Sequence, residues 1–163
     1  MEFAPLPELP GRAVVLMIGL PGSGKSSYLA HYGLSSVSTD ALRELLFGDA
    51  AEQRAAGQVF GLLYKVLTTR LEVGVPQTFI DATNLDAAAR KPLVRIAKEA
   101  GIPAIGLWLD ADVDECQARS QLRGRVVELE VIQRFARKLR PPTAAEGIDH
   151  LYRVRGSVGE WVY

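Results

Sequence analysis

The hydrophobic positions along the chain follow two patterns that alternate. Residues 13–19 form a continuous apolar run, which is typical of a strand covered on both faces of a parallel sheet. Shorter apolar runs that are rich in strand formers predict further strands at 37–39, 78–80, 105–109 and 151–154. Between these runs the apolar residues recur at spacings of three and four, as in helices that bury one face. The alternation of strands and helices indicates βαβ units and a parallel sheet.

Residues that begin and end helices sharpen this pattern. Asp40 is a favourable N-cap for the helix that follows the second strand, and Gly33 suits the end of the first helix. Another helix lies within 86–100, but its start stays open between Asp86 and Lys91 because Pro92 would lose a backbone hydrogen bond in a helix interior. Helices are predicted from Lys25 to before Gly33, from Asp40, around 59–67, within 86–100, at about 112–123 and at 128–139.

Length and composition limit the classes of protein to which the chain can belong. With 163 residues, of which 48% are hydrophobic, the chain is expected to form one globular domain spanning 1–163. Lys and Arg number 19, and so do Asp and Glu, so no net charge draws in nucleic acid. The single cysteine, Cys116, cannot form an internal disulfide and is expected to be a small buried residue. Because the start of the chain is not like a signal peptide and no apolar run could span a membrane, we expect a cytoplasmic protein with no membrane attachment. No obligate protein partner is evident.

A glycine-rich motif follows the first strand. Residues 19–26 read Gly-Leu-Pro-Gly-Ser-Gly-Lys-Ser, a full match to G-x-x-x-x-G-K-[ST] between a buried strand and a helix. In such a loop the glycines let backbone N–H groups surround a diphosphate, the lysine reaches the β and γ phosphates of ATP, and the serine offers a hydroxyl to Mg²⁺. The residues expected to bind the nucleotide here are Gly22, Ser23, Gly24, Lys25, Ser26 and Ser27.

Carboxylates follow the predicted strands at the edge of the sheet where ligands bind. Asp81 ends a strand and is a candidate Mg²⁺ residue, with capping of the next turn as the alternative. Asp40 is either a plain helix cap or a group that accepts a proton from a substrate, and the two roles are compatible. Asp110 reads as a strand-end residue and Asp112 as the cap of the following helix.

Taken together, these motifs resemble the kinase domain of the polynucleotide 5′-hydroxyl kinases. The resemblance covers most of the chain, and its wider group includes small-molecule kinases. Besides the glycine-rich loop, the segments that carry it are Ser-Thr-Asp-Ala-Leu-Arg (38–43), Ile-Asp-Ala-Thr-Asn (80–84), Ala-Arg-Ser-Gln-Leu-Arg-Gly (118–124) and Pro-Pro-Thr-Ala-Ala-Glu-Gly (141–147). One departure is Val-Val-Glu at 126–128, where the family commonly has Val-Pro, so the entry to the next helix is expected to differ.

The resemblance implies a role for individual residues. Lys25 and Ser26 would bind ATP and Mg²⁺, and Asp40 would activate the acceptor hydroxyl. Arg43, one helical turn further on, would contact a phosphate next to that hydroxyl. Asp81 would support the metal and phosphate site, with Thr83 and Asn84 shaping it. Arg119 and Arg123, four residues apart on one helix face, would be lid arginines that close on the ATP phosphates.

The expected fold is therefore an α/β P-loop NTPase with a five-stranded parallel sheet in the order 2-3-1-4-5, flanked by helices and carrying a helical lid at about 112–127. The expected function is transfer of the γ-phosphate of ATP to a 5′-hydroxyl end of DNA or RNA, or to a nucleotide acceptor. Two alternatives stay open. One is a small-molecule kinase of the sugar acid or antibiotic phosphotransferase type, which the neutral charge favours. The other is a non-catalytic ATP-dependent switch or adaptor, against which Asp40 and Arg43 argue because a switch needs no acceptor base.

Overall fold

The computed structural model describes residues 2–123 and 126–163. Its strands are β1 (Ala13–Ile18), β2 (Ser36–Ser38), β3 (Gln77–Asp81), β4 (Ala104–Leu109), β5 (His150–Arg155) and β6 (Val158–Trp161). Its helices are α1 (Lys25–His31), α2 (Thr39–Phe47), α3 (Ala56–Glu72), α4 (Ala87–Glu99), α5 (Val113–Leu122), α6 (Leu129–Lys138) and the short 3₁₀ helix η1 (Ala144–Glu146). No helix in the described part of the chain is long and apolar enough to cross a membrane.

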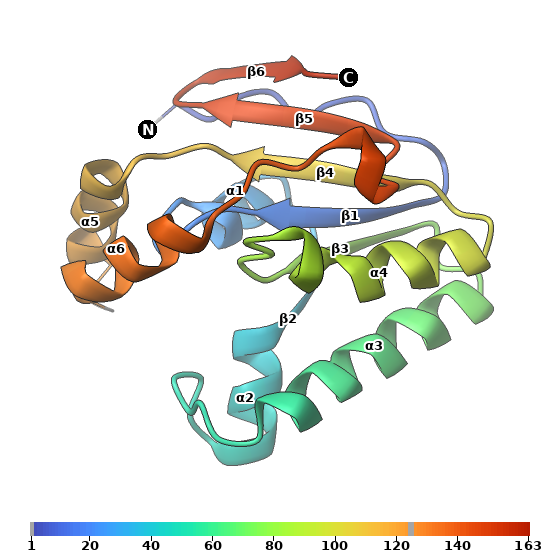
Figure 1. The fold of residues 1–163 in the computed structure, drawn as a ribbon, viewed down its shortest axis with the longest axis horizontal. Helices are drawn as coiled ribbons and strands as arrows, with labels where there is room; N and C mark the ends of the chain where they lie inside the picture. Colours follow the sequence, from blue (N-terminus) through green and yellow to red (C-terminus); the bar gives the residue numbers. More distant parts are fainter. Residues whose placement is uncertain (1, 124–125) are drawn as a thin grey trace.

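All the strands belong to one sheet in the order β2-β3-β1-β4-β5-β6 (Figure 1). The pairings from β2 to β5 are parallel, which confirms the α/β fold class and the predicted order of the first five strands. The predicted number of five strands is wrong, because β6 adds an antiparallel sixth strand next to β5. A two-residue turn at Gly156 joins the two strands, and β6 is mostly exposed, so it lacks the apolar run that would have revealed it.

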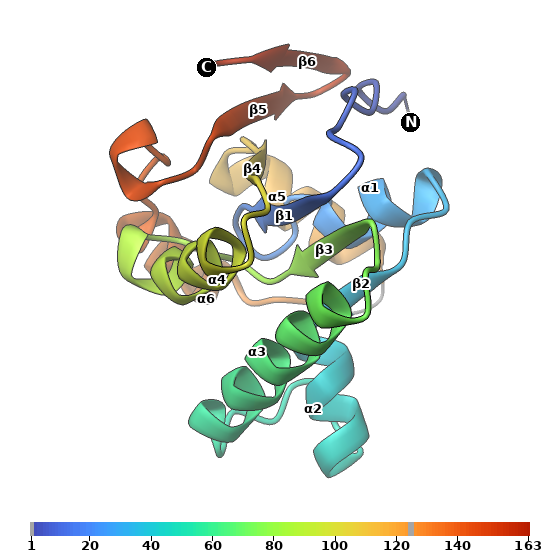
Figure 2. The same cartoon turned by 90° about the vertical axis from the view of Figure 1, so that its right-hand side faces the viewer.

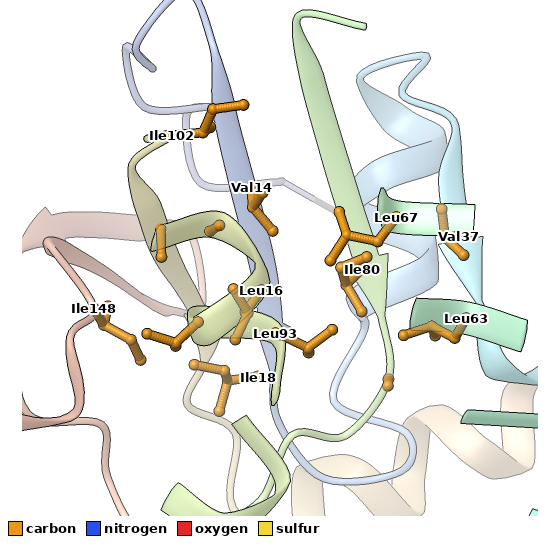
Figure 3. Packing of buried hydrophobic residues seen from close by; sticks show 14 of the residues in the cluster. Val14, Leu16, Ile18, Val37, Leu63, Leu67, Ile80, Leu93, Ile102 and Ile148 are labelled. Atoms are coloured by element: carbon orange, nitrogen blue, oxygen red, sulfur yellow. The ribbon is translucent and has the colours of Figure 1, made fainter. Parts of the chain in front are cut away.

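Both faces of the sheet are covered, which explains the unbroken apolar run in β1. Val14, Leu16 and Ile18 point to the face covered by α3 and α4, where they pack with residues such as Leu63 and Leu93 (Figure 3). The alternate residues of β1 face α1 and the chain before β1, on the other side of the sheet (Figure 2). Each strand residue is therefore buried whichever way it points.

Two predicted helix starts are resolved by caps. Asp86 caps α4 by accepting a hydrogen bond from the Ala89 N–H at 2.8 Å, so α4 runs through Pro92. Proline removes the hydrogen bond to the Ala88 carbonyl, but Ala88 is exposed and water can solvate that oxygen. The prediction that Asp40 is the N-cap of α2 is wrong: the N-cap is Ser38, two residues earlier, whose side chain accepts from the Ala41 N–H at 3.2 Å. Asp40 lies instead in the first helical turn.

The pair α5 and α6 lies at the end of the sheet to which the parallel strands point (Figure 1). Asp112 caps α5 by accepting from the Glu115 N–H at 2.9 Å, as predicted. Cys116 and Ile132 join Leu20 and Leu85 in a small apolar cluster that holds the pair against the start of the glycine-rich loop. Of the predicted lid at 112–127, residues 124 and 125 lie outside the described residues.

Candidate active site

The glycine-rich loop joins β1 to α1 and is pressed against α5. Gly22 and Gly24 have backbone φ values of 82° and 97°, which residues with a side chain rarely adopt. A Cβ atom on Gly22 would lie 2.6 Å from the Cys116 carbonyl oxygen, which is too close for any other residue. Both glycines are therefore required by the backbone conformation, and Gly22 is also required by the close approach of α5.

Lys25 is folded back into its own loop. Its Nζ donates to the carbonyls of Gly19 and Leu20, both at 3.0 Å, and only 8% of the residue is exposed. Burial lowers the pKa of Lys25 from 10.5 to about 8, while the negative charges of Asp81 and Asp40 oppose this shift. Carbonyl oxygens are neutral acceptors, so an anionic phosphate would be a stronger partner for this ammonium group.

Ser26 and Asp81 form an oxygen-rich contact across neighbouring strands. Asp81 is the last residue of β3, which pairs with β1, and its Oδ2 accepts a hydrogen bond from Ser26 Oγ at 2.7 Å. A hydroxyl and a carboxylate are hard oxygen ligands that suit Mg²⁺, which usually takes one or two protein ligands and fills the rest of its shell with water and phosphate. No group of three or more His, Cys, Asp or Glu residues that could hold a metal occurs in the described ranges. The two residues thus fit Mg²⁺ bound together with a nucleotide.

Asp40 and Arg43 form an ion pair on α2. Arg43 Nη1 lies 3.2 Å from Asp40 Oδ1, and the side chains are 11% and 52% exposed, respectively. The Nε of Arg43 is buried and has no hydrogen-bond partner among the described residues. Helix α2 follows β2 directly, and Ser38 of β2 pairs with Asp81 of β3, so α2 starts at the sheet edge that carries Asp81.

The turn after β3 is held to the start of the loop by its backbone and by Asn84. The carbonyl of Thr83 accepts from the Gly19 N–H at 3.1 Å, and Asn84 Nδ2 donates to the Met17 carbonyl at 2.7 Å. Asn84 has a φ of 47°, in the left-handed region that asparagine tolerates. Its side chain is buried in the sheet edge, so it shapes the site through the backbone.

Arg90 supports this turn and was not found from the sequence. It is fully buried on α4, donates from Nη1 to the Asn84 carbonyl at 2.8 Å, and pairs through Nε with Glu146 Oε1 at 2.7 Å. Its Nη2 also donates to the Arg140 carbonyl at 3.1 Å, just after α6. The sequence contained two features that could have indicated this ion pair: an arginine on the apolar face of α4, and Glu146 in the Pro-Pro-Thr-Ala-Ala-Glu-Gly segment. The two residues are far apart in the sequence and come together only in the folded domain.

The two predicted lid arginines extend from α5 toward the loop. Arg119 Nη1 donates to the Ser23 carbonyl at 2.8 Å, and the positive charge of Arg123 contributes to the low pKa of Lys25. Cys116 on the same helix is buried, and this raises the pKa of its thiol to about 11, so it is not a thiolate nucleophile.

A cavity continues from the loop along α5. One side of it carries Ser23, Gly24, Ser27 and the two arginines, next to the phosphate-binding motif. The remaining lining residues are both apolar and acidic: Glu2, Phe3, Ala4, Tyr28, Leu109, Asp110, Ala111, Glu115, Leu122, Val154 and Gly156. The cavity thus combines the phosphate-loop residues and two arginines with apolar side chains and three carboxylates.

The strand order, the loop at the end of β1 and the carboxylate at the end of β3 define a P-loop domain of the kinase type. The chain belongs to the AAA domain family, whose model matches residues 14–142. This range runs from β1 to the end of α6 and includes every predicted site residue.

Solved structures similar to this one are kinases and related proteins. A chain of the Pnkp1/Rnl/Hen1 RNA repair complex matches with a TM-score of 0.69 and 21% identity, covering 81% of this chain and 45% of that one. A putative kinase from Chloroflexus aurantiacus matches with a TM-score of 0.66 and 19% identity, covering 90% and 86%. A gluconokinase from Sinorhizobium meliloti matches with a TM-score of 0.60 and 17% identity, covering 90% and 85%. The chain spans less than half of the RNA repair protein, and at these identities the matches establish the P-loop kinase fold.

Proposed function

We propose that the protein is an ATP-dependent kinase that transfers the γ-phosphate of ATP to a 5′-hydroxyl end of DNA or RNA, or of a nucleotide. The observation that carries the proposal is the Asp40–Arg43 ion pair at the start of α2, because α2 follows β2 directly and Ser38 of β2 pairs with Asp81 of β3. In this proposal the carboxylate accepts a proton from the acceptor and the guanidinium binds a phosphate of the acceptor.

The donor half of the site would hold the triphosphate. The loop backbone and Lys25 bind the phosphates, and the cavity beside the loop receives the nucleoside. Ser26 and Asp81 would hold Mg²⁺, which neutralises charge on the phosphates during transfer. Arg119 and Arg123 supply further positive charge, which is the main requirement of phosphoryl transfer because the reaction needs little covalent chemistry from the protein.

The acceptor half would align the hydroxyl. Asp40 accepts a hydrogen bond from the 5′-hydroxyl and then its proton as the oxygen attacks the γ-phosphate. Arg43 would bind the phosphate on the 3′ side of the same nucleotide, and its Nε, which has no hydrogen-bond partner within residues 2–123 and 126–163, is a donor that such an anion would satisfy.

A second candidate is a small-molecule kinase. The likeness to a gluconokinase and the equal numbers of acidic and basic residues favour it. It uses the same donor site but requires no phosphate on the acceptor. An ATP-dependent switch is a weaker candidate, because Asp40 and Arg43 would have no acceptor to act on.

Labelled ATP distinguishes these proposals. The protein is incubated with Mg²⁺, ATP labelled at the γ-phosphate and, in separate reactions, a 5′-OH oligonucleotide, gluconate or no acceptor. We expect label on the oligonucleotide, loss of this transfer in Asp40→Asn, and retention in the matched control Glu44→Gln on the same helix. Label on gluconate alone would replace the first candidate with the second, and release of inorganic phosphate without any labelled acceptor would favour the switch.

A further inference from the structure

The N-terminal arm (residues 2–10) has no helix or strand, yet tyrosine hydroxyls fix it to the body of the domain. Tyr28 and Tyr152 both donate to the Pro5 carbonyl, at 2.9 and 3.0 Å. Tyr32 donates to the neighbouring Ala4 carbonyl at 2.7 Å. Tyr28 lies in α1, Tyr32 is the residue that caps the C-terminus of α1, and Tyr152 lies in β5, so the arm is fastened to two separate elements.

The residues just before these anchors belong to the cavity beside the phosphate loop. The Phe3 ring stacks on His31, with ring centroids 4.2 Å apart and an angle of 17° between the planes. It also meets Tyr28 edge to face at 6.5 Å. Phe3 is only partly buried, and together with Glu2 and Ala4 it lines the cavity. The arm therefore supplies part of the cavity wall.

The chemistry of the cavity fits the nucleoside of the donor. The phosphate loop and Arg119 border one end, where the phosphates would leave the cavity. Phe3, Leu109 and Val154 supply apolar lining, and the carboxylates of Glu2, Asp110 and Glu115 also border the cavity. A planar base attached to a triphosphate has an apolar part and an anionic part, and an aromatic ring such as Phe3 suits a planar base.

We propose that the N-terminal arm forms a wall of the nucleoside site, with Phe3 in contact with the base and the three tyrosines as positioning residues that hold the arm in place. This inference rests on the proposed use of ATP as the phosphate donor. The phosphate loop binds any nucleoside triphosphate through its phosphates, so selection among bases has to come from residues of this cavity.

The arm also covers one face of the sheet, and this role can be separated experimentally from its role in lining the cavity. Leu6 and Leu9 pack against the apolar cluster on the α1 side of the sheet and do not line the cavity. An arm that only covered apolar surface would need these leucines and the buried Ala4, but it would not need a partly exposed phenylalanine at the cavity.

The test compares Mg²⁺-ATP with Mg²⁺-tripolyphosphate, which occupies the phosphate loop but has no nucleoside. Dissociation constants for both are measured by calorimetry with the full chain. We expect Phe3→Ala to weaken ATP binding about 10-fold, corresponding to about 1.4 kcal/mol, and to leave tripolyphosphate binding unchanged. Leu9→Ala, a matched truncation of the arm outside the cavity, should alter neither constant. Tyr28→Phe keeps its ring and loses one anchor, so it should weaken ATP binding by a smaller factor without affecting tripolyphosphate.

The other possible results would contradict the role of Phe3, the nucleoside site or the proposed function. Equal loss of ATP and tripolyphosphate binding in Phe3→Ala would mean that the arm supports the loop rather than the nucleoside, and unchanged ATP binding would remove Phe3 from the site. If the native protein binds ATP no more tightly than tripolyphosphate, the cavity does not take the nucleoside, while the phosphate loop keeps its proposed role. If the native protein binds neither compound, the proposed function itself fails.

Discussion

The proposed donor side of the site, at the phosphate loop, and the proposed acceptor side, on α2, differ in how firmly the structure holds them. On the donor side, Lys25 and Asp81 are each only 8% exposed, and both are hydrogen-bonded within the loop and the sheet edge. On the acceptor side, Asp40 lies on α2, where Leu45 and Leu46 are 76% and 45% exposed. Helix α2 packs on α3 and β2 and extends away from the rest of the domain with α3 (Figure 2).

This difference has a physical cause. Buried polar groups are costly unless they are satisfied, so the donor side needs a complete set of partners, such as Arg90 for the Asn84 turn. An exposed helix has water as a partner and tolerates substitution. We therefore expect the donor chemistry to be fixed by the fold, and the identity of the acceptor to be decided on α2.

The largest effect is expected on the donor side. Lys25→Ala should lower kcat about 1,000-fold, because the lysine charge acts on the phosphates in the transition state. Transfer of labelled phosphate measures the rate, and circular dichroism checks the fold. The matched control is Lys65→Ala, an exposed lysine on α3, which should keep the native rate. A folded Lys25→Ala protein with native activity would contradict the assignment of the loop.

Asp40→Asn should have the next largest effect. Loss of the proton acceptor should lower kcat by about 100-fold, while ATP affinity stays the same because Asp40 belongs to the acceptor side. Single-turnover transfer and ATP titration measure the two quantities. If ATP affinity falls as much as kcat, Asp40 belongs to the donor side and the comparison between the two halves is wrong.

Arg43→Ala tests which kind of acceptor the proposed acceptor side binds. A hydrogen bond to a charged group contributes about 1.5 to 3 kcal/mol, so kcat/KM should fall by about 10- to 150-fold for oligonucleotides and nucleoside 3′-monophosphates. The fall should be much smaller for an acceptor that has no phosphate there. Equal losses with both acceptors would favour the small-molecule kinase.

Arg119→Ala should have a smaller effect that depends on the γ-phosphate. Arg119 donates a hydrogen bond to the Ser23 carbonyl, so its loss affects both the loop and the charge on the proposed lid. We expect kcat with ATP to fall about 10-fold and the affinity for ADP to fall less. Arg137→Ala, an exposed arginine on α6, is the control and should change neither value. An unchanged rate in Arg119→Ala would make α5 a solvated helix without a role in catalysis.

The smallest expected effect is the uptake of a proton by Lys25 when ATP binds. Because burial lowers the pKa of Lys25 to about 8, the free protein loses this proton as the pH rises through that value, and bound phosphates should restore it. Near pH 8, ATP binding should therefore take up about half a proton more in the native protein than in Lys25→Met. At pH 6.5 the two proteins should not differ. Calorimetry in buffers of different ionisation enthalpy measures this uptake, and equal uptake by both proteins at pH 8 would contradict the shift.

The same shift predicts how stability depends on pH. The unfolded chain holds the Lys25 proton up to pH 10.5 and the folded chain only up to about pH 8. The unfolded state therefore binds more protons between these values, and this lysine makes the free energy of unfolding rise with pH there. Below pH 8 the full cost of the buried charge is present.

The fold class and the position of the phosphate loop could be predicted from local signals, since an unbroken apolar run requires two covered faces and the loop glycines are required by the backbone. The strand order from β2 to β5 was predicted from the resemblance to P-loop kinases. Asp81 could be placed from the sequence because the carboxyl ends of parallel strands share one edge.

Features that depend on contacts between distant segments could not be read from the sequence and became visible in the folded domain. The pairing of Arg90 with Glu146, the antiparallel β6, and the anchoring of the N-terminal arm by three tyrosines each join segments whose sequences show no periodic pattern linking them. Asp40 was predicted to cap α2 but lies in its first turn, because the Ser38 side chain accepts the capping hydrogen bond from the Ala41 N–H. A hydrogen bond or an ion pair carries no signal along the chain until the sheet has brought its two partners together, whereas apolar burial affects every second or every third and fourth residue of an element.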